Sequence, residues 1–432
     1  MNTRATLIAA PSSHQGKTVY TAALARHYIN NGYSVQILKV GPDYLDPMLL
    51  EAASKQPVLN LDWWMMGEQQ CRQLYYDACR NADIVLVESL MGLHDNTPSN
   101  AWLANSLSLP VTLIINMAKF AQTSAAVVHG MCSYDIPFTL HGVVGNRLGS
   151  QHHHTLVNEA LENQCRYLGS LRRDDYMILP ERHLGIVQAE EINNLDQRLD
   201  EIACCLKTYD IDTDLPVVKP TKPIVDNSLP VAQISNFLQG SRIAIARDAA
   251  FSFIYPENIR LLSDMGAKIE FFSPLAGEPV PDCDALWLPG GYPELHLNSL
   301  SSQQLFLESV YNHIYSKKPT LAECGGMMVL GKTITDINGV SYSMCNAISN
   351  RFEMTRRFQS VGYQQLTIDN QTIRGHSFHH SKMLGEFSHL QRCKTVDGNN
   401  GECFFDNGGL RMGYMHLYFP SNPQLTARLF SY

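Results

Sequence analysis

Two segments of this chain combine residues whose types and spacing could do chemistry. Residues 10–18 read Ala-Pro-Ser-Ser-His-Gln-Gly-Lys-Thr. This run is typical of a loop that points backbone N–H groups at phosphate oxygens where a helix begins. We expect Ser13 and Gly16 to help bind ATP, with Lys17 reaching its outer phosphates and the Thr18 hydroxyl ligating Mg²⁺. The alternative is a chance Gly-Lys-Thr at the start of a helix.

Three carboxylates favour the nucleotide interpretation. Asp43 and Asp46 follow the apolar stretch 34–40, and Glu88 ends the apolar stretch 84–88. Ligands of α/β sheets bind at the carboxyl ends of strands, and carboxylate oxygens suit Mg²⁺. The alternative is that these acids cap helices or turns, because Asp43 and Asp46 both neighbour prolines.

The second segment centres on Cys324, which follows an apolar stretch and precedes Gly325 and Gly326. A nucleophile on a tight turn needs small neighbours because its substrate must approach closely. The sequence suggests no packing role for the two glycines. A helix that begins at this turn would lower the pKa of the thiol and favour the thiolate. The alternative is an inert, buried core thiol.

A thiolate nucleophile of the glutamine-splitting kind needs a base and an oxyanion site. His416 is the preferred base because it lies downstream, near the end of the same predicted domain. Gly290 and Gly291 end an earlier apolar stretch and could donate N–H groups to an oxyanion. A chain that both uses ATP and releases ammonia from glutamine could turn a carboxylate into an amide.

The elements that must position these residues alternate between strands and helices. In the first half, the apolar stretches predict strands, with a helix over 17–30, and they lack clean alternation, as expected when both faces of a parallel sheet are buried. The predicted strands cover residues 6–10, 34–40, 84–88, 111–116 and 142–146. We predict an α/β fold with a doubly wound parallel sheet in this half.

A proline-containing stretch over 210–231 separates this half from a second α/β set. That set has a predicted helix over 256–265 and strands over 242–246, 268–272, 285–288 and 319–323. We therefore predict two doubly wound parallel-sheet domains, over 1–205 and 241–432, joined by a linker over 206–240.

Bulk composition excludes several classes of protein. The chain has 432 residues, of which 45% are hydrophobic and 17% charged, with a net charge of −8. The charge gives no reason to expect a nucleic-acid partner. The 11 cysteines are scattered and odd in number, which indicates reduced thiols in a cytoplasm. We expect no signal peptide and no membrane span.

Together, these segments resemble the cobyrinic acid a,c-diamide synthase family, which are glutamine-dependent amidotransferases of corrinoid biosynthesis. The resemblance runs over most of the chain, and it is carried by residues 10–18, 39–47, 60–62, 87–93, 179–185, 288–296, 322–326, 374–379 and 414–422.

The resemblance implies a dethiobiotin-synthetase-like domain followed by a class I glutamine amidotransferase domain. Cys324 would hydrolyse glutamine with His416 as base, and Mg²⁺-ATP would phosphorylate the a and c carboxylates of cobyrinic acid. Ammonia would then displace phosphate. It also implies metal ligands at Thr18, Asp43 and Glu88, and Asp46 in the substrate or metal shell. A homodimer is compatible with the resemblance.

The chain departs from the family pattern at a few positions, and alternatives stay open. The family usually has glycine at His14 and Ser89, an acid at Ser377 and a second histidine at Tyr418. The alternatives are amidation of another tetrapyrrole (hydrogenobyrinic acid or nickel-sirohydrochlorin), a non-catalytic relic with a decayed phosphate loop, and a partition-type ATPase.

Overall fold

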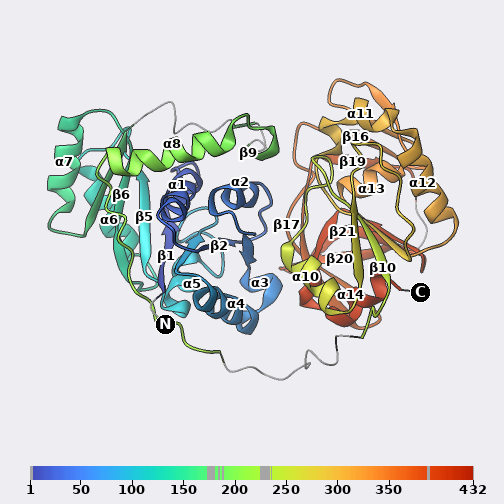
Figure 1. Cartoon of the computed structure of the whole chain (residues 1–432), viewed down its shortest axis with the longest axis horizontal. Helices are drawn as coiled ribbons and strands as arrows, with labels where there is room; N and C mark the ends of the chain where they lie inside the picture. Colours follow the sequence, from blue (N-terminus) through green and yellow to red (C-terminus); the bar gives the residue numbers. More distant parts are fainter. Residues whose placement is uncertain are drawn as a thin grey trace. The chain divides into compact units, whose positions relative to one another are not determined.

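The chain forms two compact units, Met1–Val225 and Asp226–Tyr432. The structure, a computed structural model, describes residues 3–172, 181–182, 185–186, 189–223, 234, 236–386 and 390–431. Figure 1 draws both units. Much of the string 179–185, part of the family resemblance, lies outside the described residues.

The first unit alternates strands and helices. Its elements in chain order are β1 (Arg4–Ala9), α1 (Lys17–Asn30), β2 (Val35–Val40), α2 (Leu45–Ser54), β3 (Leu59–Leu61), α3 (Trp63–Met66), α4 (Glu68–Asn81), β4 (Ile84–Glu88), α5 (Asn100–Leu107), β5 (Val111–Asn116), α6 (Thr123–Ser133), β6 (Leu140–Leu148), α7 (Gln151–Leu161), β7 (Tyr167–Arg172), β8 (Glu181–Arg182), β9 (Gly185–Ile186), η2 (Ala189–Glu191) and α8 (Leu195–Thr208).

Seven of these strands form one parallel sheet in the order β3-β2-β4-β1-β5-β6-β7. The register places Ile8 of β1 and Lys39 of β2 on either side of Glu88 of β4. The carboxyl ends of these strands are therefore level with one another. β1 lies where the strand order reverses, which is where such sheets bind ligands.

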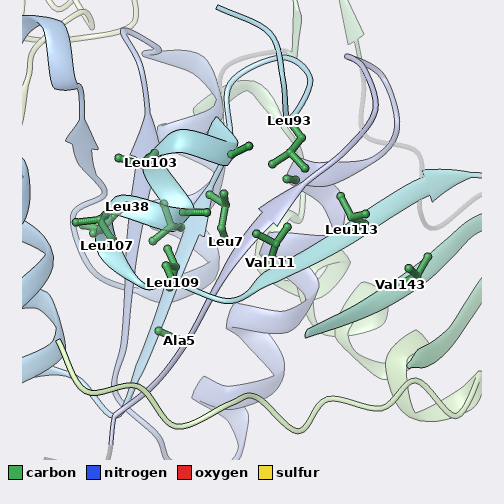
Figure 2. Packing of buried hydrophobic residues seen from close by; sticks show 14 of the residues in the cluster. Ala5, Leu7, Leu38, Leu93, Leu103, Leu107, Leu109, Val111, Leu113 and Val143 are labelled. Atoms are coloured by element: carbon green, nitrogen blue, oxygen red, sulfur yellow. The ribbon is translucent and has the colours of Figure 1, made fainter. Parts of the chain in front are cut away.

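Both faces of this sheet are buried, as its uninterrupted apolar stretches predict. Leu7 of β1 packs with Leu103 and Leu107 of α5 in one cluster (Figure 2). The neighbouring Ile8 packs on the opposite face, in the cluster that includes residues of α1, α2 and α8. Figure 1 shows these three helices together on one side of the sheet.

The second unit has more strands than the sequence analysis predicts. Its elements are β10 (Arg242–Ala246), α10 (Pro256–Asp264), β11 (Lys268–Phe272), β12 (Ala285–Leu288), η3 (Pro293–Leu295), α11 (Leu297–Ser302), α12 (Gln304–Tyr315), β13 (Thr320–Glu323), α13 (Gly325–Leu330), β14 (Thr333–Thr335), β15 (Ser341–Ser343), β16 (Arg351–Met354), β17 (Ser360–Ile368), β18 (Gln371–His379), β19 (Ser381–Leu384), β20 (Leu390–Thr395), β21 (Asn400–Asp406), β22 (Leu410–Gly413), β23 (Met415–Tyr418), η4 (Phe419–Ser421) and α14 (Pro423–Leu429).

Its main sheet has ten strands in the order β11-β10-β12-β13-β22-β21-β20-β17-β18-β23. The strands from β11 to β22 in this order run parallel, which confirms the α/β class. The remaining strands are antiparallel, an extension that the sequence analysis missed. The hairpin of β17 and β18 turns at Asp369 and Asn370, both with positive φ, as a two-residue hairpin turn requires.

The division between the units falls within the stretch 206–240 that we predict as linker. Residues 206–223 of this stretch nevertheless pack with the first unit, whereas Leu238 packs with the second. α8 continues to Thr208, Pro216 accepts a hydrogen bond from the N–H of Ala5 at 3.1 Å, and Leu215 and Val218 are buried. No helix in the described ranges has both the length and the apolar character needed to cross a membrane.

Candidate functional site

The phosphate loop connects β1 to the first residue of α1. Gly16 closes the loop at φ 97°, a left-handed conformation that favours glycine. A Cβ at Gly16 would lie 2.1 Å from Nδ2 of Asn146, which donates a hydrogen bond to the carbonyl of Gln15 at 2.8 Å. Glycine is thus required both for the turn and for the close approach of β6.

His14 adopts the conformation that the family's usual glycine would allow. Its φ is 60°, and its side chain is exposed. A left-handed conformation costs a residue with a Cβ about 1 kcal/mol. Histidine in place of glycine therefore strains the loop backbone slightly, but its side chain points to solvent and does not occupy the space inside the loop. Ser13, beside it, is also exposed.

Lys17 lies folded back along the loop. Its Nζ donates to the carbonyl of Met91 at 2.7 Å and is 3.3 Å from that of Ser12. Burial lowers the pKa of Lys17, and the attraction of Glu88 partly opposes this. The ammonium thus has neutral carbonyl partners that it could exchange for phosphate oxygens.

Lys39 gathers the predicted acids around one ammonium. Its Nζ lies 2.7 Å from Oδ2 of Asp46, 2.7 Å from Oε1 of Glu88 and 3.4 Å from Oδ2 of Asp43. The same Oε1 of Glu88 accepts a hydrogen bond from the Thr18 hydroxyl at 3.0 Å. The structure therefore brings Thr18, Asp43, Asp46 and Glu88 together, as predicted, but around a lysine.

The protonation of this cluster follows from burial and from Lys39. Burial acts to lower the pKa of Lys39, but the three carboxylates hold it well above its ordinary value. Burial and the negative charge of Asp46 raise the pKa of Asp43 to about 7. Burial also acts to raise the pKa of Asp46, but Lys39 outweighs it and holds that pKa low.

The residues present fit a nucleotide-bound Mg²⁺. Within the described ranges, no three His, Cys, Asp or Glu side chains could hold a metal by themselves. Mg²⁺ at phosphate sites, however, commonly takes only one or two carboxylates and completes its shell with phosphate oxygens and water. Oε2 of Glu88 is buried and has no hydrogen-bond partner among the described residues. This oxygen and the Thr18 hydroxyl are hard donors of the required kind.

Sequence reasoning missed two residues of this half. One is Lys39, and a lysine inside the apolar strand Val35–Val40 is itself a signal, because a buried ammonium needs acidic partners. The other is Asn146, which the sequence predicts only as part of a strand. Its position, beside the phosphate loop on β6, could be inferred only from the order of strands in the sheet.

The nucleophile turn joins β13 to α13. Cys324 has φ 45° and ψ −108°, an unusual conformation for a residue with a Cβ and typical of a strained nucleophile turn. A Cβ at Gly326 would lie 2.1 Å from the carbonyl oxygen of Leu288, and one at Gly325 would lie 2.7 Å from Cδ of Pro293. The two glycines therefore do have a packing role: they let the turn approach the end of β12.

His416, Gly290 and Cys324 meet at this turn. A Cβ at Gly290 would lie 2.2 Å from Cε1 of His416 and 3.4 Å from Cβ of Cys324. The carbonyl of Gly290 accepts a hydrogen bond from the N–H of Phe253 at 3.0 Å. A Cβ at Gly291 would lie 2.2 Å from the carbonyl oxygen of Ala250. The structure thus brings the predicted nucleophile, base and first oxyanion glycine together.

A second histidine lies beside the predicted base. His376 of β18 pairs directly across from His416 of β23, and their rings stack with centroids 5.1 Å apart. Nδ1 of His376 lies 3.1 Å from the hydroxyl of Tyr255. His376 was part of the family resemblance, but the sequence assigned it no position relative to His416.

The prediction of a lowered thiol pKa is wrong for this structure. Burial, with a smaller contribution from Glu294, raises the pKa of the Cys324 thiol well above its ordinary value. The N–H of Gly325 acts in the opposite direction but does not outweigh burial. Burial also lowers the pKa of His416 well below its ordinary value. The resting pair is a neutral thiol and a neutral imidazole.

Comparisons with known proteins match both units. A family model described as the CobQ/CobB/MinD/ParA nucleotide binding domain matches residues 6–186. A model described as the CobB/CobQ-like glutamine amidotransferase domain matches residues 242–424. The two matches cover the units that carry the phosphate loop and the nucleophile turn, respectively.

Full-length relatives are also found. A hydrogenobyrinate a,c-diamide synthase of Pseudomonas aeruginosa is 42% identical, covering 98% of this chain and 97% of that one. A cobyrinate a,c-diamide synthase of Herminiimonas arsenicoxydans is 42% identical, covering 99% and 97%. A solved nucleotide-binding protein in complex with ADP from Archaeoglobus fulgidus is 13% identical, with a TM-score of 0.31, covering 50% of this chain and 94% of that one.

Proposed function

Because the chain belongs to the a,c-diamide synthase family of glutamine-dependent amidotransferases, we propose that it amidates the a and c carboxylates of a cobyrinate-type macrocycle. The nitrogen comes from glutamine, and ATP activates each carboxylate. The single observation that carries this proposal is the presence of both half-sites in one chain. The Thr18–Glu88–Lys39 cluster lies in one unit, and the Gly290–His416–Cys324 meeting point lies in the other.

The second unit would release ammonia from glutamine. Sγ of Cys324 attacks the carboxamide carbon, and its proton passes to His416 as the C–S bond forms. His416 then gives this proton to the leaving nitrogen, and ammonia departs. Water, deprotonated by the same imidazole, cleaves the thioester to glutamate and restores the thiol. The N–H groups of Gly290 and Gly291 would stabilise the oxyanion.

The first unit would activate the substrate carboxylate. A carboxylate oxygen attacks the γ-phosphorus of ATP and displaces ADP, which leaves an acyl phosphate. Ammonia attacks the acyl carbon, phosphate leaves with the bonding electrons, and a proton is lost to water. Lys17 would exchange its carbonyl partners for phosphate oxygens, and Ser13 and Gly16 would add loop N–H groups. Mg²⁺, when bound, supplies charge neutralisation on the phosphates.

Thr18, Asp43 and Glu88 are the residues proposed to hold Mg²⁺ or its water shell, with Asp46 in the substrate or metal shell. Lys39 orders all three carboxylates before any ligand arrives, because it contacts each of them. A relic with a decayed loop is disfavoured, since the loop keeps its left-handed turn at both His14 and Gly16.

The second candidate substrate is hydrogenobyrinic acid, the acid named in the Pseudomonas aeruginosa relative. That relative and the cobyrinate a,c-diamide synthase of Herminiimonas arsenicoxydans are equally identical to this chain. Both acids therefore belong in the test. A homodimeric state, a cytoplasmic location and the absence of a nucleic-acid partner stay predictions from the sequence.

The test is mass spectrometry of cobyrinic or hydrogenobyrinic acid incubated with the protein, Mg²⁺-ATP and glutamine. We expect two successive exchanges of hydroxyl for amino in at least one of the acids. The variant Cys324→Ala should make the same product only when free ammonia replaces glutamine. Absence of product from either nitrogen source with both acids would contradict the proposal.

A further inference from the structure

Glu323 is a buried carboxylate whose role neither half-reaction explains. It is the last residue of β13 and directly precedes Cys324. Glu323 is only 1% exposed and lies among the apolar strands of the second unit. An acid in such a place must be compensated by hydrogen bonds, or its burial would cost several kcal/mol.

Both carboxylate oxygens of Glu323 accept a hydrogen bond from another strand. Oε1 accepts from the backbone N–H of Leu417 at 2.8 Å. Oε2 accepts from the indole Nε1–H of Trp287 at 2.9 Å. Burial raises the pKa of Glu323 to about 8, and the hydrogen bonds from Leu417 and Trp287 act in the opposite direction. Both partners are donors only, so each carboxyl oxygen must accept from its partner, whether the group is ionised or protonated.

These two bonds reach the strands that carry the rest of the glutaminase site. Leu417 follows His416 on β23, and β23 pairs with β18 but not with β13 in the described sheet. Trp287 lies on β12, three residues before Gly290. The Glu323 side chain therefore links β13, which precedes the nucleophile, to β23, which carries the base, and to β12, which precedes the oxyanion glycines.

We propose that Glu323 is a positioning residue for glutamine cleavage: it holds Cys324, His416 and Gly290 in register through Leu417 and Trp287. The proposal rests on the glutaminase half of the proposed function. Glu323 acts through its neighbours and does not touch glutamine. Misplacement of reacting groups by about 1 Å can cost about 10²-fold in rate, so loss of this link should lower kcat more than it raises KM.

The test compares Glu323→Gln with wild type in glutamine hydrolysis. Glutamine has the same shape, but its amide turns one N–H donor toward either Leu417 or Trp287, which are donors themselves. We expect kcat to fall by about 10- to 100-fold, with KM for glutamine nearly unchanged. Synthesis from free ammonia should persist.

A second substitution tests the geometry. Trp287→Phe removes one of the two opposing donors, so in the double variant the amide oxygen can face Leu417. Glu323→Gln with Trp287→Phe should therefore recover part of the lost kcat. A matched control is Asp406→Asn. It replaces another carboxylate of this sheet by an amide, and that carboxylate accepts a hydrogen bond from Gly408 and pairs with Arg411. It should lower thermal stability and leave kcat unchanged.

Three results would overturn the role of Glu323. The first is a kcat of Glu323→Gln equal to that of wild type. The second is a fall in kcat that comes with a comparable rise in KM and a loss of thermal stability. The third is a kcat of the double variant no higher than that of Glu323→Gln. Glutamine hydrolysis by the wild-type protein tests the proposed function separately. A wild-type protein that does not hydrolyse glutamine would contradict that function.

Discussion

The thiol of Cys324 and the imidazole of His416 are both held neutral by burial. Separating their charges in advance would cost desolvation of two ions, which a buried pair seldom recovers. In the proposed reaction a bound substrate changes this balance, because the proton would move to His416 while the negative charge would pass to an oxygen facing Gly290. The site is therefore arranged to form charge during the reaction and not before it.

This neutral pair predicts the pH dependence of glutamine hydrolysis. His416 works as a base only when it is neutral, and its pKa lies well below its ordinary value because of burial. Activity should thus be kept as the pH falls through about 6.5, the ordinary histidine pKa. The measurement is kcat/KM for glutamine between about pH 5 and 8, and a loss centred at or above pH 6.5 would contradict the assignment.

Gly290 predicts a second effect at the scale of single atoms. In Gly290→Ala the new methyl group would lie 2.2 Å from the ring of His416, so one of them must shift. We expect kcat for glutamine hydrolysis to fall by about 10²-fold, with ammonia-dependent synthesis retained. Gly339→Ala is the control, because a Cβ there strains the backbone but has nothing within 4 Å. Equal kcat values for the two variants would rule out the proposed contact.

At the scale of elements, the first unit works through strand ends that lie level with one another. Lys39 of β2 bonds to Glu88 of β4 and to Asp46 of α2, so one ammonium connects two strands and a helix. Level ends are a property of parallel strands in register, and they explain why acids far apart in sequence converge. The elements supply the site's geometry, and Lys39 supplies its charge balance.

Lys39→Met should therefore destabilise the first unit as well as inactivate it. Removing one partner of a buried ionic group leaves uncompensated charge and costs about 3–5 kcal/mol. Thermal unfolding of the variant measures this loss. Lys55→Met is the control, because the Lys55–Asp196 pair is about half exposed and such pairs contribute little. A stability loss no larger than that of the control would contradict the central position of Lys39.

At the scale of the whole molecule, most of the parallel strands of both units could be predicted from the sequence, but the parallel strands β3, β7 and β22 were missed. Buried parallel strands are continuous apolar stretches, and β4 (Ile84–Glu88), β5 (Val111–Asn116) and β10 (Arg242–Ala246) begin and end where the sequence predicts. The antiparallel strands were missed because many of their residues are half-exposed. β17 and β21, for example, alternate irregularly between buried and partly exposed residues.

The candidate sites were predictable in their residues but not in their environment. Cys324 and His416 could be paired from their motifs, yet the direction of the thiol pKa depends on burial, which no motif records. The role of Lys39 was missed because it depends on ion pairs with residues of other elements, and the sequence of its own strand does not show them. The role of Glu323 was likewise invisible, since both of its bonds cross to other strands.

The order of strands in the second unit has a consequence for how the protein is made. β22 lies between β13 and β21 in the sheet, although it follows both in the chain, and His416 comes after it. A ribosome that has just completed β13 has delivered Cys324 and the whole first unit, but neither β22 nor the base. If His416 is the base of glutamine hydrolysis, as proposed, a partly translated chain cannot consume glutamine, and ammonia release begins only after the unit proposed to use it has been synthesised.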